Sequence, residues 1–79
     1  MLMIGCAKAK FLADKINNLT YENVHFTVES IEGLSFKVKH NANNEQAAKT
    51  IIKQYVSTLP ELKNLYINIQ YVDEKGTIL

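Results

Sequence analysis

The chain has 79 residues and a formal net charge of +1, and 47% of its residues are hydrophobic while 22% are charged. This length and composition predict one small globular domain over residues 1–79 and argue against a disordered chain or a membrane span. All nine basic residues are lysines. Because arginine is the residue whose planar fork recognises phosphate and guanine, no nucleic-acid partner is expected.

The only cysteine, Cys6, has no partner for an internal disulfide, which predicts a reducing, cytoplasmic location. Residues 1–6 resemble the end of a bacterial lipoprotein signal, in which small residues precede a lipidated cysteine. A signal also needs a basic segment and about 7–15 apolar residues, and only five residues precede Cys6. A cell-envelope location, and a membrane partner with it, is therefore the alternative only if a signal segment lies upstream of Cys6.

Apolar residues three and four apart predict a first helix over residues 7–18. The apolar stripe consists of Ala9, Leu12, Ala13, Ile16 and Leu19. At 100° per residue, Phe11 projects about 150° away from this stripe, among charged side chains. We therefore interpret Phe11 as an exposed aromatic residue and a candidate contact residue.

Two alternating runs, residues 24–28 and 34–38, predict a β-hairpin with one apolar face. Keeping the apolar residues of both runs on one face requires paired residue numbers with an even sum. We expect Phe26 opposite Val38 and a three-residue loop, residues 31–33, with Gly33 at positive φ.

The second face of this hairpin is polar and carries Thr27 and Lys37, which are candidate contact residues. The expected register places His25 on that face and His40 on the other. A joint site of Cys6 and both histidines is therefore not expected, because at most one imidazole can approach the thiol.

Asn43, followed by Gln46 three residues later, predicts the N-cap of a second helix that continues to Pro60. Its apolar arc is expected to form the centre of the core through Ile51, Ile52, Tyr55 and Val56. The last strand is predicted over residues 65–72, and residues 77–79 are expected to fold back after a turn. Tyr66 and Val72 alternate with the apolar residues of that strand and are candidate contact residues.

The element order αββαβ predicts an α+β two-layer sandwich in which both helices cover one face of the sheet. A right-handed connection through the second helix makes the second hairpin strand parallel to the last strand, which gives a mixed sheet. If residues 2–5 form a leading strand, the order becomes βαββαβ and the fold is ferredoxin-like.

Three short motifs follow the order of the small bacterial BON domain, and residues 24–72 resemble that family. They are Gly33-Leu34-Ser35-Phe36, Ala47-Ala48 and Leu59-Pro60-Glu61-Leu62. The chain departs from the family at Glu61, where a glycine is usual, and at Lys37 and Lys39, where a second glycine is expected. The resemblance implies a cell-envelope domain that binds phospholipid or protein.

The favoured hypothesis is a non-enzymatic binding module that meets an unknown protein partner, or a second copy of itself, through a sheet face or an edge strand. The alternatives are the BON-like envelope function and a small enzyme or metal carrier. No catalytic, cofactor or metal site is expected, because Cys6 lacks a second thiol and the three glycines lie apart. The candidate contact residues are Phe11, Thr27, Lys37, Tyr66 and Val72.

Overall fold

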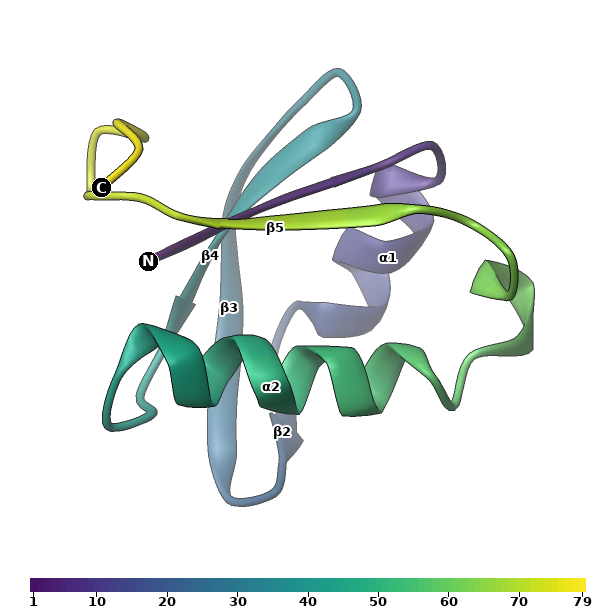
Figure 1. Ribbon diagram of the computed structural model, residues 1–79, viewed down its shortest axis with the longest axis horizontal. Coiled ribbons are helices and arrows are strands. Elements are labelled where there is room, and N and C mark those ends of the chain that lie inside the picture. Colours follow the sequence, from purple (N-terminus) through teal and green to yellow (C-terminus); the bar gives the residue numbers. More distant parts are fainter.

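The computed structural model describes all of residues 1–79 and contains two helices and a five-stranded sheet (Figure 1). The strands are β1 (Leu2–Cys6), β2 (Leu19–Tyr21), β3 (Val24–Glu32), β4 (Ser35–His40) and β5 (Ile67–Tyr71). The helices are α1 (Ala9–Ile16) and α2 (Glu45–Val56), and a single 3-10 turn, η1 (Pro60–Leu62), precedes β5.

The sheet has the strand order β2-β3-β4-β1-β5, and every neighbouring pair is antiparallel. The α+β class is therefore confirmed, but the expected mixed sheet is wrong. β1 lies between β4 and β5, because Leu2, Ile4 and Cys6 alternate toward the core and are fully or almost fully buried. A strand in that place separates two strands that run in the same direction.

The leading strand makes the order of the main elements βαββαβ, which was the alternative prediction for residues 2–5. β2 is a further strand that neither prediction contained. α1 is shorter than expected, because Asn18 takes a left-handed φ of 63° and the chain enters β2 at Leu19. Glu22 and Asn23, both at positive φ, form the two-residue turn from β2 to β3, as a type I′ hairpin requires.

The hairpin of β3 and β4 keeps Phe26, Val28, Phe36 and Val38 on the predicted face, but not the predicted register. Leu34, which was expected on the same face, lies in the turn and is 65% exposed. Phe26 lies opposite His40 and not Val38, which pairs with Val28. A β-bulge follows Val28, and the loop shortens to two residues with Gly33 at the expected positive φ of 59°. The bulge adds one residue to β3, which the alternation of apolar residues does not reveal.

Both helices cover the same face of the sheet, and the core between the two layers contains Phe26, Phe36 and Ile52. Only Ala48 and Ile52 of α2 are fully buried. The predicted core centre is therefore right for Ile52 and wrong for Ile51, Tyr55 and Val56, which are half-buried at the sides of the helix. The N-cap of α2 is Asn44, whose Oδ1 accepts a hydrogen bond of 2.7 Å from the Ala47 N–H. The predicted cap at Asn43 is therefore one residue too early.

The residues after β5 fold back on themselves, as expected. Val72 pairs with Ile78, and the Asp73 carboxylate accepts hydrogen bonds from the N–H groups of Lys75 and Thr77, both at 2.9 Å. Figure 1 shows this segment curled beside the end of β5. Neither helix of the molecule has the length and apolar character that crossing a membrane requires.

Candidate functional site

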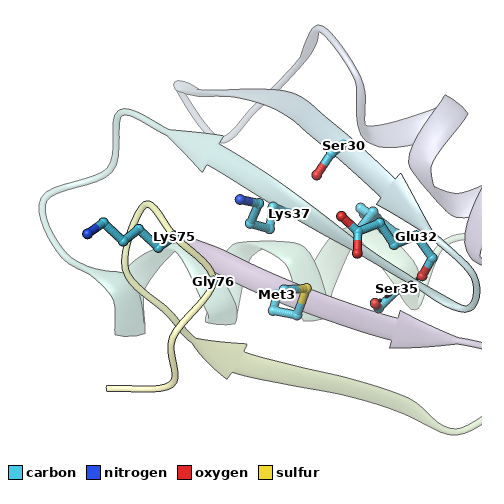
Figure 2. A pocket seen from close by; sticks show the side chains of 8 residues that line it. Met3, Ser30, Glu32, Ser35, Lys37, Lys75 and Gly76 are labelled. Carbon is cyan, nitrogen blue, oxygen red and sulfur yellow. Dashed lines mark hydrogen bonds between the residues drawn. The ribbon is translucent and has the colours of Figure 1, made fainter.

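The face of the sheet that the helices leave uncovered, here called the open face, contains a polar hollow of about 230 Å³ (Figure 2). The hollow lies over β1, β3 and β4 beside the C-terminal turn, and its lining residues are Met3, Ser30, Glu32, Ser35, Phe36, Lys37, Lys75 and Gly76. The turn approaches closely, since a Cβ atom on Gly76 would lie 3.6 Å from Cε of Met3.

The hollow is dipolar, with Lys37 toward the C-terminal turn and the Glu32 carboxylate at the other end (Figure 2). The Lys37 ammonium group donates a hydrogen bond of 3.1 Å to the Glu74 carbonyl. One of its three N–H donors is therefore already used by the turn. No group of three or more His, Cys, Asp or Glu side chains in the molecule is placed to hold a metal ion.

The five candidate contact residues do not form one surface. Thr27 and Lys37 lie on the open face, both half-buried, and Tyr66 is 82% exposed just before β5. Val72 is only 1% exposed, so its predicted place on the surface is wrong. The physical reason is the C-terminal segment, which folds back against it. The predicted exposure of Phe11 is also wrong, since this ring is half-buried against the core. Lys15 Nζ lies 5.6 Å from its ring centroid.

Cys6, His25 and His40 occupy three different environments. Cys6 is a buried free thiol whose sulfur accepts the Lys8 N–H at 3.3 Å. His25 is exposed, and its Nδ1 lies 2.9 Å from the Thr20 hydroxyl. The His40 side chain is only 5% exposed and lies beside Phe26.

His40 belongs to a polar cluster at the start of α2. Its Nδ1 accepts the Ala42 N–H at 3.1 Å, which places the proton of the neutral ring on Nε2, 2.9 Å from Glu45 Oε1. The second oxygen of Glu45 lies 2.8 Å from the Met1 amine. Burial by itself would raise the pKa of the Glu45 carboxyl, but the hydrogen bonds from this amine and from His40, together with the charge of the amine, lower it below its ordinary value.

The outer edge of β5 has backbone groups without partners. The Val72 N–H bonds to the Met1 carbonyl, so in the antiparallel ladder Asn68 and Gln70 also direct their backbone groups toward β1. Ile67 and Ile69 therefore direct their N–H and C=O groups away from the sheet, where no group of the chain bonds to them. We call the outward backbone groups of Ile67 and Ile69 the open edge.

The open edge is closed at both ends by hydrogen bonds within the chain. At one end the Leu65 N–H donates to the Leu62 carbonyl at 3.1 Å, and at the other end the Tyr71 carbonyl accepts the Leu79 N–H at 3.0 Å. The C-terminal segment thus occupies the place that a further strand would take beside Tyr71. Only the stretch from Ile67 to about Gln70 is free to pair.

The opposite edge of the sheet is protected in several ways. β2 covers the first part of β3, and the Val28 N–H beyond it donates to the Asn17 side chain at 3.1 Å. The bulge and the acidic side chains of Glu29 and Glu32 follow. Bulges and charges are the devices that prevent edge strands from pairing, whereas β5 has no charged residue, no proline and no bulge.

An apolar groove of about 460 Å³ begins where β5 begins. It lies among the end of α2, η1 and the first residue of β5, and its apolar lining comes from Val56, Leu59, Pro60, Leu62, Leu65 and Ile67. A strand added along β5 would direct alternate side chains toward this helix-covered side of the sheet. The groove offers space to such a side chain.

The sequence indicated a sheet face or an edge strand as the surface, and the residues named for it were chosen for exposed side chains. The open edge consists of backbone groups, which every residue carries, so side-chain exposure does not single it out. The sequence did contain a signal for this edge: the last strand, Ile-Asn-Ile-Gln-Tyr, has no charged residue, whereas the first hairpin strand contains two glutamates. The position of β5 at the edge depended on β1, which was predicted over residues 2–5 and only as an alternative.

Comparison with known proteins gives no relative: no family model, no curated protein and no solved structure matches this chain. The resemblance to the BON domain and the cytoplasmic location therefore stay predictions. The function has to be argued from the geometry of this molecule.

Proposed function

We propose that this chain is a protein-interaction module that binds an extended segment along the open edge of β5. The observation that carries the proposal is the pair of outward residues Ile67 and Ile69, whose backbone donors and acceptors have no partner in the chain. Addition of a strand satisfies such groups with main-chain hydrogen bonds, and neighbouring pockets for alternate side chains supply specificity. The apolar groove beside Ile67 provides one such pocket.

The difference between the two sheet edges supports the proposal. One edge is blocked by β2, by a side-chain cap and by a bulge, while the other presents uncharged, regular backbone. Exposed regular edges carry a risk of unwanted pairing, so an edge whose free stretch has no charge, proline or bulge fits a surface that is used. The exposed ring of Tyr66, which directly precedes β5, adds an aromatic side chain of the kind that anchors interfaces.

Replacing Ile67 by proline tests the proposal, because proline removes one outward N–H group and leaves the ladder to β1 intact. Ile67→Ala is the matched control, since it shortens the same side chain but keeps the N–H group. Peptides selected from a random displayed library on the wild-type protein should bind Ile67→Ala and lose at least about tenfold affinity for Ile67→Pro. Equal binding to both variants would exclude the open edge as the binding surface.

A further inference from the structure

We propose that the partner at the open edge is a second copy of this chain, and that two β5 strands pair antiparallel about a twofold axis beside Asn68. This inference rests on the proposed function and names its partner. A twofold interface is self-complementary, so each residue must tolerate its counterpart in the other copy. β5 meets that condition, because Ile67, Asn68, Ile69, Gln70 and Tyr71 carry no charge.

The hydrogen bonds that close both ends of the open edge leave one register for the pairing of two β5 strands. In that register Ile67 of each copy lies opposite Ile69 of the other, and each such pair exchanges both backbone hydrogen bonds. Moving the axis to Ile69 would need the Tyr71 carbonyl, which already accepts from Leu79. Moving it to Ile67 would need the Leu65 N–H, which already donates to Leu62. The register around Asn68 therefore satisfies the most outward groups.

The Asn68 side chain fits the axis position. It lies on the open face opposite Gly5, which has no side chain to crowd it, and its amide makes no hydrogen bond within the chain. Residues in a non-hydrogen-bonded antiparallel pair have Cα atoms about 4.5 Å apart and side chains in contact. Two amides at this distance can each donate and accept, so they complement each other.

Asn68 also gives a charge-reversal test, because a residue on the axis meets its own copy. Asn68→Lys and Asn68→Asp each bring two like charges together and should weaken the dimer at least about tenfold. An equal mixture of the two variants brings opposite charges together and should recover dimer as a heterodimer. Ile31→Lys, at the exposed edge of β3, adds the same charge elsewhere and should leave the dimer unchanged.

Sedimentation equilibrium over a concentration series measures these outcomes, with circular dichroism to show that each variant is folded. Wild-type protein that stays monomeric throughout the series overturns the inference, even if a variant fails to fold. So does unchanged dimerisation of both Asn68 variants. If the wild-type protein is monomeric while library peptides bind Ile67→Ala and not Ile67→Pro, the proposed function stands and only the self-pairing falls.

Discussion

At the scale of single residues, His40 is a buried side chain with a partner at each ring nitrogen. The alternation of its strand places it on the core face, and the tertiary structure supplies both of its ring partners from the turn and first residue of α2. A buried polar group without partners would cost about 1–3 kcal/mol, so these two contacts make its burial tolerable. The cluster thereby links the end of β4 to the start of α2.

Replacement of Glu45 by glutamine should reveal this cluster through its pH dependence. The folded pKa of Glu45 is lowered, so its contribution is complete above the unfolded value of 4.5 and disappears as the pH falls through the folded value. We expect Glu45→Gln to be about 1 kcal/mol less stable than wild type near neutral pH.

Urea unfolding of both proteins from about pH 7 to about pH 3 measures the difference in the free energy of unfolding. The gap between them should narrow on the acid side. A gap that stays constant over this range would show that the cost of the substitution is steric and not electrostatic.

At the scale of elements, backbone conformation at turns decides where strands begin. Glu22 at a φ of 53° and Asn23 at 65° allow β2 and β3 to form a tight hairpin, and Gly33 at 59° does the same for β3 and β4. Glycine and asparagine adopt this region readily, whereas glutamate does so at a cost. Packing of the β2–β3 hairpin must therefore offset the unfavourable backbone conformation of Glu22.

Relief of this strain is predicted for Glu22→Asn, which should raise the free energy of unfolding by about 0.5–1 kcal/mol. The control is Glu32→Asn, which makes the same change of side chain at a position without positive φ and should give no gain. Thermal unfolding of the two variants beside wild type measures the effect. A loss of stability in Glu22→Asn would mean that the glutamate side chain has a favourable role in the turn.

At the scale of the whole molecule, one continuous core holds both layers together. Ile52 of α2 is fully buried at the same layer boundary as Phe26, Phe36 and Ile4, which come from β3, β4 and β1. The two sheet edges then differ because β1 lies between β4 and β5 and leaves β5 at the outside. The open edge is thus a consequence of the strand order.

Shortening a side chain of this core is expected to destabilise the domain strongly. Ile52→Ala should lower the free energy of unfolding by about 2–5 kcal/mol, a large part of the stability of a small domain. Ile51→Ala removes the same atoms from a half-buried position and should cost less than half as much. Denaturant unfolding of both variants measures the costs, and equal costs would contradict the assigned faces of α2.

The sequence by itself determined the α+β class, the apolar faces of both helices and of the first hairpin, and the turn at Gly33. These features depend on periodicity and on local backbone preference, which a few neighbouring residues express. The bulge after Val28, the strand β2 and the place of β1 between β4 and β5 were decided by tertiary structure. Pairing between distant segments depends on which strands compete for each edge, and short runs such as Leu19–Tyr21 gain their stability only from that pairing. The open edge at Ile67 and Ile69 was also decided by tertiary structure, because a backbone group is free only when the strand order leaves it without a neighbouring strand.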